Sequence, residues 1–215
     1  MEKSKEFDWD RTLNIDTIGR DDAKEDAYHY PYEPTPYSVL ERLVKSNYIS
    51  DENIVIDYGC GKGRVGFFLY DNLACKVIGI DFDERMCEAA RKNCLNYESA
   101  VHRKKKKLKR SGLEQNNGEL EFLCESAEKY EIEDADRFYF FNPFSVEILK
   151  SVIGKMKKSY YENPREMLLF FYYPSDEYIS YLMTVLELCF VDEIDCQDLF
   201  EGDNARERIV VFEFL

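Results

Sequence analysis

The feature that most constrains the fold is an apolar segment that runs into a glycine-rich turn and then into a helix. Residues 54–57 (Ile-Val-Ile-Asp) are predicted to form a buried strand, and glycines follow at positions 59, 61 and 63 before an amphipathic stretch at 65–73. Glycine tolerates positive φ and lets another group approach the backbone, while the start of a helix presents free N–H groups. A strand, turn and helix of this kind is typical of α/β domains that bind a ligand at the turn.

The same alternation continues along the chain and predicts the fold class. Further strands are predicted at 77–80, 120–124, 138–141, 167–173, 189–194 and 209–214, and helices at 84 to about 100, 146–156 and 177–186. No helix is predicted between the last two strands, which are therefore expected to pair antiparallel. The pattern predicts an α/β fold with a doubly wound, seven-stranded, mainly parallel sheet, an antiparallel last strand and helices on both faces.

The first 50 residues are expected to form a leader and a capping helix, and residues 51–215 the ligand-binding domain. Thr35 is predicted to cap a helix that opens with Pro36 and ends near Asn47. The aromatic stretch at 28–37 (YHYPYEPTPY) has two interpretations, a lid over the ligand or an apolar strap packed on the sheet.

Composition narrows the cellular setting and the partners. The formal net charge of −14 argues against general affinity for nucleic acid, although residues 102–110 (HRKKKKLKR) hold seven of the 29 basic residues. That run is expected to be a solvated helix end, with an RNA-binding segment as the alternative, so a nucleic acid partner is possible but not favoured.

The seven cysteines include no C-x-x-C pair, which favours reduced thiols and predicts no metal site. Without an apolar span or a signal segment, we expect a cytoplasmic protein with no membrane partner. The oligomeric state is not predicted.

Two carboxylates flank the glycine turn and distinguish between possible ligands. The turn also contains G-x-G-x-x-G, the pattern of dinucleotide-binding turns, at Gly61, Gly63 and Gly66. Asp81 ends the second strand, where a ribose could bind. Asp57, however, would repel a pyrophosphate by roughly 4 kcal/mol at 4 Å and an effective dielectric of 20. The same carboxylate would attract the ammonium group of an amino acid.

The sequence from Asp57 to Gly63 resembles the D-x-G-x-G-x-G motif of class I S-adenosylmethionine-dependent methyltransferases, whose domain is Rossmann-like. The resemblance extends over residues 53–215 and implies S-adenosylmethionine (SAM) as the cofactor. It implies that Asp57 and Gly59 hold the methionine moiety, Asp81 the ribose and Phe82 one face of the adenine. The cofactor-binding residues expected on this basis are Asp57, Tyr58, Gly59, Gly61, Gly63, Asp81, Phe82, Glu125, Ser126 and Ala127.

The end of the fourth strand supplies the candidate catalytic residues, Asn142, Pro143 and Phe144. This segment is similar to the N-P-P-[FY] motif of methyltransferases that modify amines and amides, although it has one proline where that motif has two. An amide oxygen and a main-chain carbonyl can accept hydrogen bonds from a target NH2 while an aromatic ring stacks on it. The other interpretation is a turn that ends the strand and walls the cofactor pocket.

The sequence therefore predicts an enzyme that transfers methyl from SAM to a nitrogen or oxygen of an unidentified acceptor, which could be a small molecule, a protein or RNA. Two alternatives stay open at this point. One is an NAD(P)-dependent oxidoreductase built on the G-x-G-x-x-G pattern, and the other is a catalytically silent binding protein with the same fold.

Overall fold

Seven strands form one sheet in the order β3-β2-β1-β4-β5-β7-β6. The computed structural model describes residues 2–23, 28–108 and 119–215. The strands are β1 Ile54–Tyr58, β2 Lys76–Asp81, β3 Leu120–Cys124, β4 Arg137–Phe140, β5 Leu168–Tyr172, β6 Leu188–Asp195 and β7 Arg208–Phe214. The first five run parallel, and β7 pairs antiparallel with both β5 and β6. The predicted fold class is confirmed.

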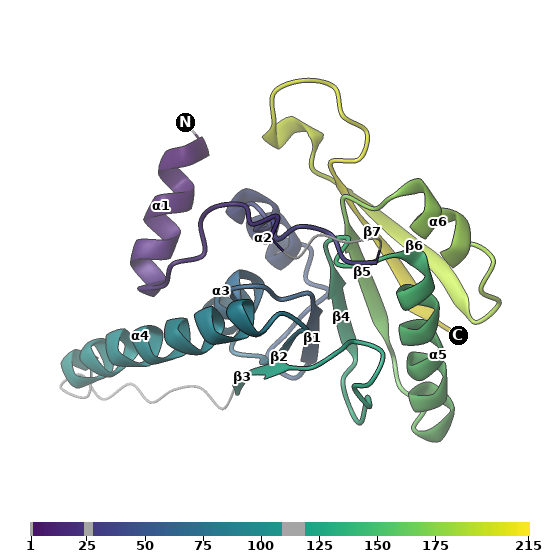
Figure 1. Cartoon of the computed structure of the whole chain (residues 1–215), viewed down its shortest axis with the longest axis horizontal. Helices are drawn as coiled ribbons and strands as arrows, with labels where there is room; N and C mark the ends of the chain where they lie inside the picture. Colours follow the sequence, from purple (N-terminus) through teal and green to yellow (C-terminus); the bar gives the residue numbers. More distant parts are fainter. Residues whose placement is uncertain (1, 24–27, 109–118) are drawn as a thin grey trace.

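Helices cover the sheet on both faces (Figure 1). They are α1 Glu2–Leu13, α2 Tyr37–Lys45, α3 Arg64–Leu73, α4 Glu84–Leu108, α5 Val146–Glu162 and α6 Asp176–Leu182, with a short 3-10 turn at Gln197–Leu199. Among the described residues, none of these helices has the length and apolar character that a membrane crossing requires.

Two hydrophobic cores lie on opposite faces of the sheet because successive strand residues point to opposite sides. In β5, Phe170 packs with α2 and α3 on one face, whereas Leu169 and Phe171 pack with α5 and α6 on the other. All of β4 and β5 is buried. This two-sided burial explains why both strands read as continuous apolar runs in the sequence.

The structure corrects several expectations about helices. Pro36 rather than Thr35 is the N-cap of α2, and no side chain caps this end. The Thr35 hydroxyl instead lies 3.1 Å from the Tyr139 hydroxyl inside the core. Helix α1 was not predicted, α5 is longer than expected at its carboxyl end, and α6 ends at Leu182 instead of 186. The side chains of the basic run, and residues 111–118, lie outside the described residues.

The register of the sheet brings several strand ends to one edge. Tyr58 of β1 lies beside Ile80 of β2 and Phe140 of β4. Strand order reverses here, since the chain moves outward from β1 to β3 and then returns to β4 beside β1. This is the place where open α/β sheets bind their ligands.

Candidate functional site

A cavity of about 460 Å³ opens at the carboxyl ends of β1, β2 and β4. This volume lies within the range of roughly 300–1,000 Å³ that is typical of small-molecule sites. The turn after β1 forms its floor, and the N–H groups of Gly59 and Cys60 donate to the Ile80 carbonyl at 2.8 and 3.1 Å. These bonds fix the turn to the neighbouring strand.

Asp57 is the most unusual group in this cavity wall. Its side chain is buried, and Oδ2 has no hydrogen-bond partner among the described residues. Burial, with a smaller contribution from nearby Asp81, raises the pKa of Asp57 to about 8. A buried carboxylate oxygen without a donor is costly, so a cationic ligand group at this position would satisfy it.

Asp81 lies at the end of β2 and is better satisfied. It accepts the N–H of Gly61 on Oδ2 at 2.8 Å and the N–H of Asp83 on Oδ1 at 2.9 Å. Burial raises the pKa of Asp81 despite these two bonds. Each carboxylate oxygen can accept more than one hydrogen bond, so Asp81 retains capacity for two ribose hydroxyls.

Two glycines of the turn are required by close packing as well as by backbone conformation. Gly59 has a φ of +74°, and a Cβ there would lie 2.3 Å from Cβ of Pro143. Gly61 has a φ of +53°, and its Cβ would lie 2.2 Å from the ring of Tyr32. The glycine pattern therefore brings two distant segments, the end of β4 and the N-terminal stretch, onto the turn.

The predicted adenine region is partly covered by another side chain of the protein. Phe82 is 40% exposed, and the ring of His29 stacks on it with centroids 3.8 Å apart. The imidazole therefore covers one face of Phe82. On the far side, residues 125–127 line the cavity, and the Glu125 N–H donates to the Asp81 carbonyl at 2.9 Å.

Three predicted cofactor-binding residues do not form the cavity wall. Tyr58 packs in the core with its ring stacked on Phe140. Gly61 is covered by Tyr32, and Gly63 begins α3 with a φ of +89°. The cavity wall does include Asp57, Gly59, Asp81, Phe82, Glu125, Ser126 and Ala127.

The three candidate catalytic residues line the same cavity, but the protein's own contacts occupy much of their hydrogen-bonding and stacking capacity. Asn142, at a φ of +40°, donates from Nδ2 to the Tyr173 carbonyl at 2.5 Å and accepts the Ser175 N–H on Oδ1 at 3.2 Å. The Pro143 carbonyl accepts the Tyr30 N–H at 3.4 Å. The Phe144 ring is 4% exposed. Asn142 therefore retains one acceptor position on Oδ1, and Phe144 is a core residue in this conformation.

The aromatic stretch at 28–37, for which the sequence left a lid and a strap open, contributes residues to the cavity wall that were not named individually. His29 pairs with Phe144 as an isolated antiparallel bridge, and Tyr28 accepts the Ser145 N–H on its carbonyl at 2.7 Å. Tyr30 and Tyr32 also line the cavity. The signal in the sequence was the density of aromatic residues, which does not reveal which element they pack against.

This sheet order, with a glycine turn between two acids at its switch point, defines a SAM-dependent methyltransferase fold. The sequence profile of the methyltransferase domain family matches residues 49–158, just over half of the 215 residues. The chain belongs to this family. The predicted class, a methyltransferase domain with SAM as its cofactor, is confirmed, and the oxidoreductase is set aside.

Known proteins similar to this chain are also methyltransferases. A stretch of 63 residues, 28% of this chain, is 38% identical to a protein-lysine N-methyltransferase of Saccharolobus islandicus strain REY15A and covers 39% of that protein. A second relative is the tRNA (uracil-54, C5)-methyltransferase of Pyrococcus abyssi, solved with S-adenosylhomocysteine (SAH). It aligns with a TM-score of 0.54 and 13% identity, and the alignment covers 93% of this chain and 45% of that protein. A proposed methyltransferase of Streptococcus mutans, also solved with SAH, aligns with a TM-score of 0.52 and is 15% identical to this chain. The alignment covers 86% of this chain and 100% of that protein. At these identities the two structures support the fold alone.

The residues around the cavity fit SAM. The unpaired oxygen of Asp57 suits the α-ammonium group of the cofactor, and Asp81 has acceptor capacity left for the ribose. Gly59 lines the cavity beside them.

The affinity for SAH is expected to rise as the pH increases from 6 to 8. Asp57 must be ionised to pair with an ammonium group, and its pKa in the ligand-free protein is about 8. Below that pH, binding must first remove a proton, so affinity falls by up to about tenfold per pH unit. The rise levels off above about pH 8, where Asp57 is already ionised in the ligand-free protein. Calorimetric titration at pH 6, 7 and 8 measures this profile, and a flat profile would exclude Asp57 as the partner of the ammonium group.

Proposed function

We propose that this methyltransferase holds the α-ammonium of SAM on Asp57 and the ribose on Asp81, and that it methylates the side-chain amine of a protein lysine. The observation that carries the cofactor placement is the buried, unpaired oxygen of Asp57. We also propose that Phe82 and residues 125–127 receive the adenine, and that Tyr58, Gly61 and Gly63 contribute through the backbone turn on which Gly59 and Asp57 depend.

Two observations favour a lysine acceptor. The relative from Saccharolobus islandicus acts on protein lysine, and its match to this chain is 38% identical over 63 residues. The net charge of −14 and the sequence pI of about 4.7 favour encounter with a basic protein over encounter with RNA. The shared sequence and the charge therefore point to the same class of acceptor.

The chain's own residues have a positioning task in the transfer. SAM supplies a methyl group on a sulfonium, which reacts readily with an aligned nucleophile. An amine at the end of β4 can donate to the Pro143 carbonyl and to the remaining acceptor position of Asn142 Oδ1. These bonds would direct the nitrogen lone pair toward the methyl carbon, and alignment of this kind supplies a large share of catalysis in bimolecular reactions. The amine reacts in its neutral form, so its proton leaves to solvent before the transfer.

The acceptor is tested with SAM that carries a tritiated methyl group. The protein is incubated separately with a lysine-rich protein and with tRNA at physiological salt, and we expect the label to enter the protein and to appear as methyl-lysine after acid hydrolysis. Label in tRNA would replace lysine by RNA as the acceptor. Binding of SAH without label in either macromolecule would point to a small-molecule acceptor.

A variant at position 142 tests the acceptor side of the proposal. Asn142→Ala is expected to lower kcat by roughly 10- to 100-fold, in the range of a lost transition-state hydrogen bond, with little change in the Kd for SAH. Because Asn142 also bonds Tyr173 and Ser175, the melting temperature is recorded alongside. Unchanged turnover in a folded variant would remove Asn142 from the reaction centre.

We further propose that residues 51–215 form the methyltransferase domain, behind an N-terminal extension at 1–50, and that the protein is cytoplasmic. The family match from residue 49 onward supports the division, and seven free cysteines support a reducing compartment. Limited proteolysis of the full chain and imaging of a C-terminal fluorescent fusion test these two points.

A further inference from the structure

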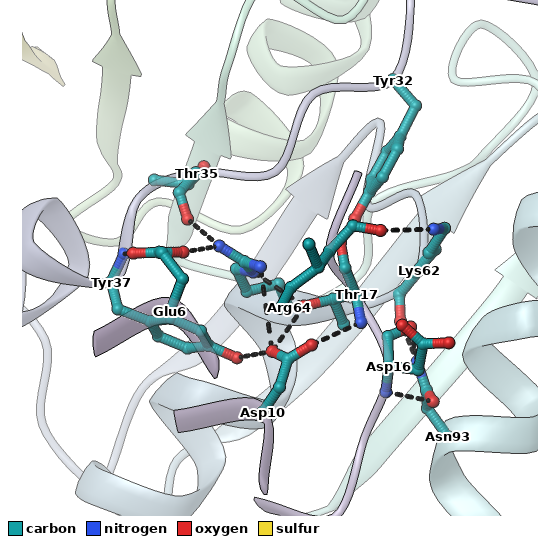
Figure 2. A network of polar contacts seen from close by, with 11 residues as sticks. Glu6, Asp10, Asp16, Thr17, Tyr32, Thr35, Tyr37, Lys62, Arg64 and Asn93 are labelled. Carbon is teal, nitrogen blue, oxygen red and sulfur yellow. Dashed lines mark hydrogen bonds and ion pairs between the residues drawn. The ribbon is translucent and has the colours of Figure 1, made fainter. Parts of the chain in front are cut away.

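A buried polar network connects the N-terminal segment to the start of α3, as Figure 2 shows. Arg64, the first residue of α3, is 2% exposed. Its Nε donates to the Thr17 hydroxyl at 2.7 Å, and its Nη1 donates to the Thr35 carbonyl at 3.2 Å and forms an ion pair with Glu6. The guanidinium also lies over the Tyr37 ring, 4.4 Å from its centroid. Arg64, which directly follows Gly63 of the turn, is therefore held by contacts with the N-terminal segment and α2.

Asp10 of α1 is the second fixed point of this network. Its carboxylate accepts the N–H of Thr17 at 2.6 Å, the hydroxyl of Thr17 at 2.8 Å and the hydroxyl of Tyr37 at 2.6 Å. Asp10 is 5% exposed. A buried carboxylate that accepts three hydrogen bonds is well satisfied, so Thr17 is held in one position relative to α1 and α2.

Thr17 in turn positions Tyr32. The Tyr32 hydroxyl donates to the Thr17 carbonyl at 2.6 Å, and its ring lies against Gly61 of the glycine turn. On the other side, Lys62 lies over the same ring at 5.2 Å and donates to the Ile18 carbonyl at 3.0 Å. The ring is therefore fixed at its hydroxyl end and across its face.

Hydrogen bonds of Asn93 connect the segment around Thr17 to α4. Asn93 exchanges two hydrogen bonds with the backbone of Asp16, at 2.9 and 3.1 Å, and donates to the Lys62 carbonyl at 3.0 Å (Figure 2). The segment around Thr17 is thus fixed to three helices: α1, α3 and α4.

We propose that Tyr32 is a cofactor-binding residue whose ring closes the cavity over the glycine turn at the amino acid end of SAM, and that Asp10 and Thr17 are positioning residues for it. The cavity has its full volume with Tyr32 in place and is lined by Tyr32 together with Asp57 and Gly59. Tyr32 is therefore part of the wall of the site and does not fill it. The inference rests on the placement of the amino acid end beside Asp57 under the proposed function.

The proposal predicts a loss of affinity that depends on which part of the ligand is present. Tyr32→Ala is expected to weaken SAH at least tenfold, and to change the affinity for 5′-methylthioadenosine, which lacks the amino acid, less than twofold. Tyr32→Phe keeps the ring and loses only the bond to Thr17, so its loss for SAH is expected to be two- to fourfold. Comparing two ligands in the same variant cancels any general loss of folded protein, and Tyr32→Leu serves as a second variant that keeps apolar bulk over Gly61.

The positioning residues are tested by steady-state kinetics. Thr17→Val and Asp10→Ala are expected to raise the KM for SAM three- to tenfold with less than a twofold change in kcat, and Asp10→Asn, which keeps an acceptor oxygen, to recover part of the loss. The matched control is Tyr161→Ala on α5, whose side chain is 63% exposed and bonds Glu187 outside the cavity. It should leave both parameters unchanged.

Two outcomes would overturn the inference. One is a folded Tyr32→Ala protein that binds SAH as tightly as the wild type. The other is an equal loss for SAH and 5′-methylthioadenosine, which would assign Tyr32 to general support of the fold. Failure of the lysine assay with intact SAH binding would affect only the proposed acceptor, so the two proposals fail separately.

Discussion

Asp57→Asn is expected to weaken SAH binding by at least 100-fold and at the same time to raise the melting temperature of the ligand-free protein. The loss of affinity follows because asparagine has no charge to pair with an ammonium group. A hydrogen bond to a charged group contributes about 1.5–3 kcal/mol, and a factor of 100 corresponds to about 2.8 kcal/mol. The buried oxygen at this position has no other described partner that could compensate.

The gain in stability follows from the raised pKa. Asp57 titrates at about 8 in the folded protein and near 3.9 in an unfolded chain. Between these values the folded protein retains a proton that the unfolded chain has released, so increasing pH favours unfolding. Asparagine does not titrate, so we expect the variant to gain free energy of unfolding, most at pH 8 and less toward pH 4.

Thermal unfolding at pH 5 and pH 8, with and without SAH, measures both effects. The matched control is Asp51→Asn, at an exposed acid in the turn before β1, which should change neither affinity nor stability appreciably. If Asp57→Asn bound SAH like the wild type, the carboxylate would not be the partner of the amino group.

Gly59→Ala is expected to abolish measurable SAH binding and to lower the melting temperature by several degrees. A residue with a side chain at a φ of +74° costs roughly 1–2 kcal/mol in backbone conformation alone. The new methyl group would also lie 2.3 Å from Cβ of Pro143, a rigid neighbour whose displacement moves the end of β4. The change therefore disturbs the cofactor turn and the acceptor side together.

Gly154→Ala is the matched control for this substitution. Gly154 lies inside α5, and a Cβ there would have no atom within 4 Å. Alanine in a helix interior is favoured over glycine by roughly 0.5–1 kcal/mol, so this variant should be slightly more stable and bind SAH normally. Normal binding by Gly59→Ala would show that the turn can move away from Pro143.

The sequence predicted the sheet and the two acids because these features depend on local patterns. The apolar runs of β1 and β5, and the glycine turn between β1 and α3, are contiguous in the chain. The antiparallel pairing of β6 with β7 followed from the lack of a helix between them. Asp57 was identified by its position directly before the turn.

The remaining features depend on contacts between distant residues. Helix α1 has a polar sequence, and it is held on α2 by the buried carboxylate of Asp10 together with Glu6 and Trp9. The Thr35 hydroxyl bonds Tyr139 across 104 residues of sequence, which is why it is not available as a cap. Phe144 likewise packs against Tyr58, which lies far from it in the sequence. No window of sequence contains both partners of these contacts.

The unpaired oxygen of Asp57 has a thermodynamic consequence for the enzyme's working cycle. Near neutral pH the ligand-free protein carries a proton on this side chain, and under the proposed placement of SAM a cationic cofactor displaces it. Each arrival of SAM therefore liberates a proton into the buffer, and each departure of the spent cofactor takes one up again. The heat of cofactor binding will consequently depend on the ionisation enthalpy of the buffer, even though Asp57 takes no part in the transfer of the methyl group.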